Sequence, residues 1–147
     1  MNYENLHELI NRYEKNIVFY NNDDNEETFK WEAVQTFQRV WFSQQSQDLS
    51  FAELFRQATK DSSVLVNNSH VWPTTGVVKL AEVAETEVRR LFEEILFAED
   101  NGDLELRQNH MDLFEEEFNK LLYRYFPTSY KYKQNRHAAS CYLAMYA

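Results

Sequence analysis

Residues 29–42, FKWEAVQTFQRVWF, decide the fold of this chain. The stretch contains two of the three tryptophans, three of the eleven phenylalanines and two valines. Apolar residues three or four positions apart form a stripe along one face of a helix, and others widen it. The stripe comprises Phe29, Ala33, Phe37, Val40 and Trp41, and Trp31 and Val34 widen it. We therefore expect a central helix that several neighbouring elements bury.

The rest of the chain is also built from segments of helical period. Only two glycines and two prolines occur in 147 residues, whereas the tight turns of a β-protein need many more turn formers. The pattern predicts an all-α fold, with residues 1–147 forming a single compact helical domain of about six helices. The helices are expected at 3–20, 29–42, 48–60, after Thr86, after Asp103 and at 134–146, with a short segment from Gly76 to Val83 and an irregular segment near 61–75.

Several helix ends carry their own signals. Ser50 and Glu53 form a capping box, in which the serine hydroxyl accepts the Glu53 N–H and the glutamate reaches back to the Ser50 N–H. Asp103 is suited to cap the longest helix, and Gly102 before it suits a backbone with positive φ. Pro127 ends that helix, because the residue before a proline disfavours the α conformation.

The sequence favours a cytoplasmic protein. Cys141 is the only cysteine, which excludes an internal disulfide and suits a reducing compartment. The first residues, MNYENLHELI, lack the basic start and apolar run of a signal peptide. Uncharged apolar runs fall far short of the roughly 20 residues that cross a bilayer, so we expect no membrane association.

Charge is distributed unevenly along the chain. The formal net charge is −9, which opposes general binding to a phosphate backbone. All 24 acidic residues lie in 1–120, where 11 basic residues leave a net charge of −13. Residues 121–147 contain four basic residues and no acidic residue, for a net charge of +4. This asymmetry is the strongest compositional indication of a binding surface.

The basic region interleaves cations with aromatic rings. The candidate binding residues are Arg124, Tyr130, Lys131, Tyr132, Lys133 and Arg136. Rings beside a cationic groove hold single-stranded nucleic acid, with the cations meeting phosphates and the rings stacking on bases. Alternatively, these four cations pair with the acidic body of the same protein, and their small number favours this second interpretation.

No arrangement of residues predicts catalysis or a metal. No phosphate-binding loop occurs, because Gly76 and Gly102 lie far apart and no Gly-Lys-Ser/Thr is present. Glu4 and His7 supply one half of a di-metal Glu-x-x-His pair, but the second half is missing. Lone cysteines are usually buried, so Cys141 is expected to be a core residue even though a helix would bring it near His137.

Runs of glutamate give no catalytic site either. Residues 93–94 and 115–117 are consecutive glutamates, as expected of solvated helix faces. Catalytic carboxylates need burial to shift a pKa, which a surface run does not provide. We expect no catalytic residue, no metal and no cofactor.

Short motifs in a fixed order resemble a known family. They are KWEAV (30–34) with FQ (37–38), FAELF (51–55) after Asp48, VR-LF (88–92), and YKQ (132–134) followed by Arg136, Ala138 and YL (142–143). This order resembles the helical N-terminal region ahead of the ATPase domain in bacterial McrB-like AAA-family proteins. Those proteins belong to modification-dependent restriction and related phage defence.

The resemblance covers residues 25–146 and implies a role without chemistry of its own. The nucleotide-binding part of the family is missing, so the chain is expected to be an N-terminal module or a truncated fragment of a larger protein. It would be a non-enzymatic recognition or accessory module that binds DNA or a partner subunit of a restriction system. The alternative is a protein-interaction or assembly domain without nucleic-acid contact, favoured by the acidic body and the many aromatic residues.

Overall fold

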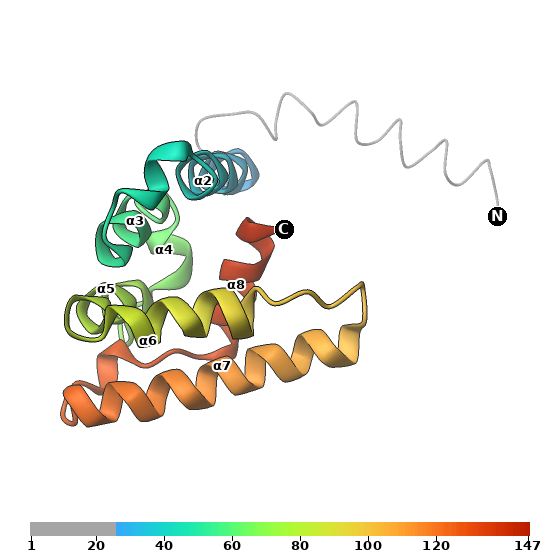
Figure 1. The fold of residues 1–147 in the computed structure, drawn as a ribbon. Helices are drawn as coiled ribbons and strands as arrows, with labels where there is room; N and C mark the ends of the chain where they lie inside the picture. The colour runs from blue at the N-terminus through green and yellow to red at the C-terminus, as the bar shows by residue number, and fades with distance from the viewer. Residues whose placement is uncertain (1–25) are drawn as a thin grey trace, which may run out of the picture. The chain divides into compact units, whose positions relative to one another are not determined.

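The computed structural model describes residues 26–147, all of them helical or irregular in conformation (Figure 1). The helix predicted at 3–20 and the Glu4–His7 pair lie outside the described residues. The chain divides into a unit of residues 1–32 and a unit of residues 33–147. Helix α2 (Glu26–Trp41) begins in the first unit and ends in the second.

The described residues confirm the all-α prediction. Besides α2, they form the α-helices α3 (Phe51–Ala58), α4 (Ser63–Val66), α5 (Pro73–Val83), α6 (Glu85–Arg90), α7 (Leu104–Tyr125) and α8 (Arg136–Tyr146). Two short 3₁₀ turns, η1 (Gln44–Gln47) and η3 (Tyr130–Tyr132), and a π-helical turn, η2 (Leu91–Leu96), complete the order. None of the described helices is both long enough and apolar enough to cross a membrane.

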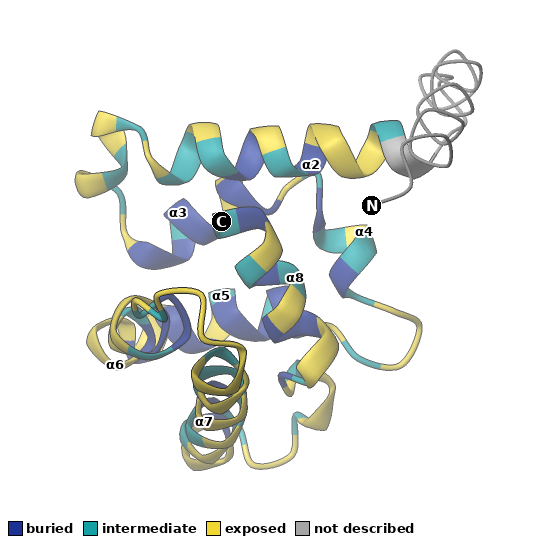
Figure 2. Cartoon of the chain, turned by 90° about the vertical axis from the view of Figure 1, so that its right-hand side faces the viewer, coloured by how far each residue is buried: buried dark blue, intermediate teal, exposed yellow. Residues whose placement is uncertain are grey.

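The core of residues 33–147 is a cluster of aromatic rings around Phe92. The Phe92 ring lies 4.9 Å from the ring of Phe114, 5.3 Å from that of Phe55 and 5.5 Å from that of Tyr142, measured between centroids. These rings come from η2, α7, α3 and α8, and all four are buried. Figure 2 shows the buried residues gathered on the inner sides of α3, α5 and α8. The core therefore joins elements that are far apart in the sequence.

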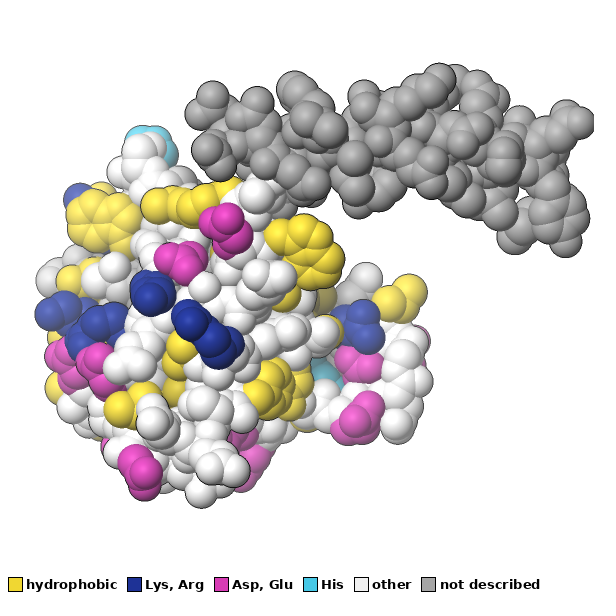
Figure 3. All heavy atoms as spheres, turned by 90° about the horizontal axis from the view of Figure 1, so that it is seen from above, with side chains coloured by type: hydrophobic (Ala, Val, Ile, Leu, Met, Phe, Trp, Pro, Cys, Tyr) yellow, Lys and Arg dark blue, Asp and Glu magenta, His cyan; other side chains and the backbone are white. Residues whose placement is uncertain are grey.

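Helix α2 is buried on one face only, so the prediction of burial on several sides is wrong. Ala33 and Phe37 are buried, and the Trp41 ring stacks on Phe37 at 5.1 Å. Trp31 is 66% exposed and Phe42 is 59% exposed. At 100° per residue, these two positions lie off the stripe that the buried residues define. Figure 3 looks onto this side of the chain and shows hydrophobic side chains at the surface between charged ones.

The capping box at the start of α3 is half confirmed. The Ser50 hydroxyl accepts the Glu53 N–H at 3.2 Å, as predicted. The Glu53 carboxylate instead contacts Arg56 and Gln57 on its own helix. A carboxylate from another helix completes the cap, since Glu85 Oε1 accepts the Phe51 N–H at 2.6 Å. The cap therefore also ties α3 to the start of α6.

Helices α6, η2 and α7 form an antiparallel hairpin, visible in Figure 1. The first arm starts at Glu85, ahead of the predicted cap Thr86, and ends in a π-turn in which the Phe97 N–H donates to the Phe92 carbonyl at 2.8 Å. In the turn, Gly102 has φ of 79°, as predicted. Asp103 caps α7 by accepting the Leu106 N–H at 3.1 Å, which was also predicted.

The inner face of α7 is shorter than its apolar pattern predicts. Phe114, Phe118 and Leu122 are buried, but Leu104 at the start of the stripe is exposed. The apolar pattern therefore begins one or more turns before the buried part of α7. Helix α8 is joined to α2 by the Gln38 side-chain amide, which donates to the Met145 carbonyl at 2.9 Å.

The irregular segment near 61–75 is confirmed in outline, with one short helix inside it. Helix α4 occupies four of these residues, and α5 begins at Pro73, three residues before the predicted start at Gly76. Proline suits the first helical turn because its missing N–H would have no partner there. Gly76 serves another purpose: a Cβ at this position would lie 2.2 Å from the carbonyl oxygen of Tyr132. Only glycine allows η3 to approach α5 this closely.

Replacing Gly76 with alanine is expected to destabilise the protein by about 1–3 kcal/mol, because the new methyl group overlaps the Tyr132 carbonyl. In an ordinary helix interior the same change would stabilise by about 0.5–1 kcal/mol. Urea unfolding of G76A and of the wild type measures whether the free energy of unfolding falls or rises. The matched control is Thr75→Ala in the same helix, which gains helix propensity without a clash. A G76A protein at least as stable as the wild type would contradict the close approach.

Candidate binding surface at the end of α7

The structure places the predicted binding residues along one continuous stretch of chain. Arg124 lies in the last turn of α7, Tyr130, Lys131 and Tyr132 form η3, and Arg136 begins α8. This stretch runs back across the start of α5, which contacts η3 (Figure 1). The six residues therefore lie along one stretch of chain, but their side chains have different surroundings.

Gln134, which the sequence marked only as part of the YKQ motif and not as a buried residue, fixes the stretch from inside. Its side chain is 1% exposed. The amide nitrogen donates to the Pro73 carbonyl at 2.8 Å and to the Tyr132 carbonyl at 3.2 Å. The amide oxygen accepts the Tyr142 hydroxyl at 2.8 Å. Because burial alone would penalise this amide, its complete set of partners makes it a structural anchor rather than a binding group.

Asn119 on α7 holds the backbone of the same residue. Its Oδ1 accepts the Gln134 N–H at 2.9 Å, and its Nδ2 donates to the Gln134 carbonyl at 3.0 Å. A side-chain amide thus bonds both polar groups of one peptide residue, as a neighbouring strand would. The stretch between η3 and α8 is consequently fastened to α7 as well as to α5.

Lys131 and Tyr132 have structural contacts that the sequence did not predict. The Lys131 carbonyl accepts the Trp72 N–H at 2.6 Å, and the Lys131 Nζ lies 4.8 Å from the centre of the Trp72 ring. This is the geometry of a cation–π contact. The Tyr132 ring packs edge-on against Phe126 at 6.1 Å and is partly buried. The charged Lys131 side chain is exposed at the surface, whereas the partly buried Tyr132 ring mainly packs against the protein.

Arg136 pairs with the acidic body of the protein. Its guanidinium bonds the Asp112 carboxylate on α7. Within residues 26–147, Arg124, Lys131 and Lys133 form no ion pair. The alternative of internal pairing therefore describes one of the four cations, and three remain available at the surface.

A shallow hollow of about 180 Å³ lies beside one of these cations, Lys133. Tyr123, Tyr130 and Lys133 line it together with Asn119, Leu122, Phe126, Pro127 and Ser129. The two tyrosines are 70% and 66% exposed, and no carboxylate lines the hollow. Tyr123 was missed from the sequence, although its position next to the buried Leu122 places it off the inner stripe of α7. We call Tyr123, Tyr130 and Lys133 the tyrosine hollow.

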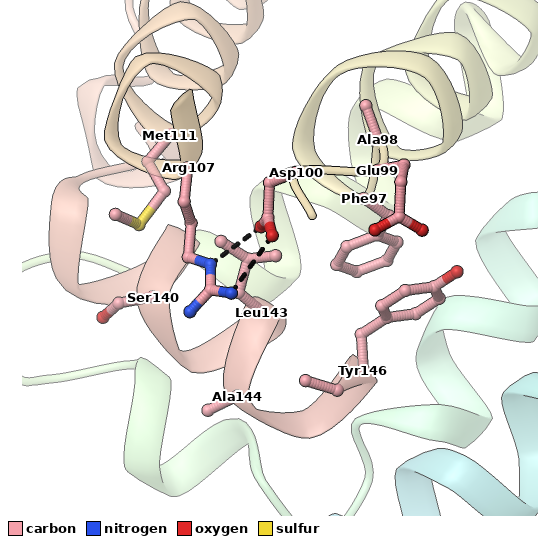
Figure 4. A pocket seen from close by; sticks show the side chains of 11 residues that line it. Phe97, Ala98, Glu99, Asp100, Arg107, Met111, Ser140, Leu143, Ala144 and Tyr146 are labelled. Carbon is pink, nitrogen blue, oxygen red and sulfur yellow. Dashed lines mark hydrogen bonds and ion pairs between the residues drawn. The ribbon is translucent and has the colours of Figure 1, made fainter. Parts of the chain in front are cut away.

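A second hollow, of about 430 Å³, lies where the α6–α7 turn meets α8 (Figure 4). Asp100 and Arg107 point toward one another across it, with Arg107 Nε 2.8 Å from Asp100 Oδ2 and Nη2 3.2 Å from Oδ1. Asp100 Oδ1 also accepts the Gly102 N–H at 2.8 Å. These bonds, the one from Arg107 first, lower the Asp100 pKa from 3.8 to about 2. Through these bonds, the Asp100 carboxylate holds the α6–α7 turn against α7.

His137 and Cys141 face each other as the helical spacing suggested, but their setting is not that of a nucleophile. The Cys141 Sγ is 3.7 Å from His137 Nε2, and the same nitrogen lies 2.9 Å from the Leu65 carbonyl. Burial raises the pKa of the Cys141 thiol, which disfavours the reactive thiolate. Among residues 26–147, no group of three His, Cys, Asp or Glu side chains could hold a metal ion.

Comparisons with known proteins add no identification. No protein-family model matches the chain, and searches of curated proteins and of solved structures found no match. The assignment of a function therefore depends on the residues and geometry of the chain.

The Asp100–Arg107 pair predicts a specific acid sensitivity. Because the folded protein holds the Asp100 pKa near 2, below its ordinary value of 3.8, the carboxylate stabilises the fold above about pH 3.8. That contribution is lost as the pH falls to about 2. We expect Asp100→Asn to lower the free energy of unfolding at pH 7, and the difference from wild type to shrink toward pH 2. Urea titrations at several pH values test this, with Asp48→Asn as the control. A pH-independent difference would contradict the ion pair.

Proposed function

We propose that the chain is a non-catalytic recognition module that binds DNA through unpaired bases at the tyrosine hollow. The observation that carries the proposal is the exposure of Tyr123 and Tyr130 beside Lys133 in a region without acidic lining. Exposed rings next to cations hold single strands by stacking on bases and pairing with phosphates. Duplex DNA keeps its bases stacked internally, so unpaired or extruded bases fit this surface better.

The two kinds of side chain would divide the work. Tyr123 and Tyr130 would stack on bases, which tolerates any sequence because every base has an aromatic face. Lys133 and Arg124 would meet phosphates, and Lys131 on the Trp72 ring would extend the contact toward α5. The net charge of −9 opposes these contacts at long range, so affinity would be modest and strongly dependent on salt.

The resemblance to McrB-like proteins supports a recognition module that acts together with an ATPase. In such an assembly the chain would recognise DNA, and the ATPase that performs the work would be a separate part. The buried Gln134 side chain supports a recognition role, because a surface that is ordered before a ligand arrives loses little conformational entropy on binding.

A protein-interaction role is the second candidate, and exposed leucines on α7 favour it. Leu106 and Leu113 are both exposed and lie seven residues apart, which places them on one outer face of the helix. Apolar positions at this spacing are typical of a helix that enters a groove on a partner. Light scattering and a Leu113→Lys variant test this role: an oligomer that the variant dissociates supports it, and a monomer in both proteins contradicts it for self-association.

The DNA proposal predicts which substitutions weaken binding. In gel-shift titrations at low salt, Tyr130→Ala should weaken binding to a single-stranded oligonucleotide by about 1–3 kcal/mol, the value of one stacked base. Lys133→Gln should lower the slope of log affinity against log salt by about one. Methylated and unmethylated duplexes, titrated beside the single strand, show whether methylation of the DNA changes the affinity.

Arg39→Gln is the control for these variants, because Arg39 is an exposed cation on α2, away from η3. It should leave binding nearly unchanged. Absence of binding at tens of micromolar, or equal weakening by Arg39→Gln and Lys133→Gln, would overturn the proposal.

A further inference from the structure

A third hollow, of about 360 Å³, lies between the end of α3, α4 and α5. Its charged lining comprises three cations, Arg56, Lys60 and Lys79, and one carboxylate, Glu82. The polar lining adds Thr59, Ser63, Asn67, Thr74 and Thr75. In a protein with a net charge of −9, a concave surface with this excess of positive charge is unusual. It shares no lining residue with the tyrosine hollow.

The single carboxylate in the lining is already engaged. Glu82 Oε1 lies 3.5 Å from the Arg56 guanidinium, which also pairs with Glu53 on its own helix. Arg56 and Glu82 therefore largely cancel each other. The two lysines differ, since neither Lys60 nor Lys79 forms an ion pair or a hydrogen bond within residues 26–147. Their charges are the ones available to a ligand.

The uncharged groups also divide into engaged and free donors. Asn67 and Thr74 bond each other, with Asn67 Nδ2 2.8 Å from Thr74 Oγ1, and the Thr59 hydroxyl donates to the Phe55 carbonyl at 2.7 Å. The hydroxyls of Ser63 and Thr75 have no partner in the described part of the chain. Thr75 also lies in the first turn of α5, where the helix dipole favours a negative charge.

We propose that this hollow binds the phosphate group of a small phosphorylated molecule. Four free donors, the ammonium groups of Lys60 and Lys79 and the hydroxyls of Ser63 and Thr75, match a ligand that offers acceptors and negative charge. The volume lies within the range of about 300–1,000 Å³ typical of small-molecule sites. A carboxylate ligand would satisfy fewer of these donors, since a phosphate presents three acceptor oxygens. This site is independent of the proposed DNA contact.

Isothermal titration of the full chain with inorganic pyrophosphate and, separately, with adenosine monophosphate tests the site. We expect saturable binding of at least one of them at millimolar concentration or below. Lys60→Gln and Lys79→Gln should each weaken it by about tenfold, the effect of one lost charge-assisted hydrogen bond. Tighter binding of pyrophosphate would indicate an inorganic or diphosphate ligand, and tighter binding of the nucleotide a phosphoester.

Arg39→Gln is the matched control, because it removes one positive charge from an exposed position on α2 that lines neither this hollow nor the tyrosine hollow. It should leave the affinity for phosphate within about twofold of wild type. Thr75→Val removes one donor hydroxyl at similar size, and thermal unfolding of each variant checks that the fold is intact. Failure of both ligands to bind wild type, or equal weakening by Arg39→Gln, would overturn the site. DNA binding by the tyrosine hollow is unaffected by either result.

Discussion

The packing of the C-terminal half depends on the hydrogen bonds of the Gln134 side-chain amide. It joins the start of α5, through the Pro73 carbonyl 61 residues away in sequence, to two segments close to it in the chain: η3, through the Tyr132 carbonyl, and α8, through the Tyr142 hydroxyl. In a buried setting each of these groups would cost about 1–3 kcal/mol if left without a partner. A single residue therefore satisfies several groups at once and fixes their relative positions.

Three neighbouring contacts hold the same stretch of chain in place. Gly76 lets the Tyr132 backbone approach α5, the Trp72 N–H bonds the Lys131 carbonyl, and Asn119 holds the Gln134 backbone. Together they convert a stretch without regular structure into a fixed part of the surface. The proposed recognition role depends on this rigidity, because the rings and cations near η3 are then positioned before any ligand arrives.

Local patterns predicted what local chemistry determines. The helical class, the Ser50 and Asp103 caps and the positive φ of Gly102 could be predicted from short stretches of sequence, because each depends on neighbours within a few residues. The exposure of Trp31 and Leu104 could not, because an apolar residue is buried only where another element covers it. Periodicity shows which side of a helix is apolar, but it does not show how far its partner extends.

The candidate site was predicted in position but not in detail. Composition drew attention to residues 121–147, where acidic residues are absent. It could not separate Arg136, which pairs with Asp112, from Lys133, which lines the tyrosine hollow. Nothing in the sequence indicated that Gln134 is buried, since a glutamine in an irregular, basic stretch is usually solvated. Its burial arises from contacts with Pro73 and Tyr142, which only the folded chain brings together.

The most direct test of the anchoring role of Gln134 is amide hydrogen exchange of Gln134→Met beside the matched exposed variant Gln108→Met. Methionine keeps the length and shape of the side chain but removes every hydrogen bond of the buried amide. We expect Gln134→Met to lose roughly 2–5 kcal/mol in the free energy of unfolding, because several buried groups lose their partner. We also expect faster exchange of the Trp72, Tyr132 and Lys133 amides, whereas Gln108→Met should behave as wild type. Unchanged exchange at η3 and unchanged stability would contradict the claim that this amide holds the surface in place.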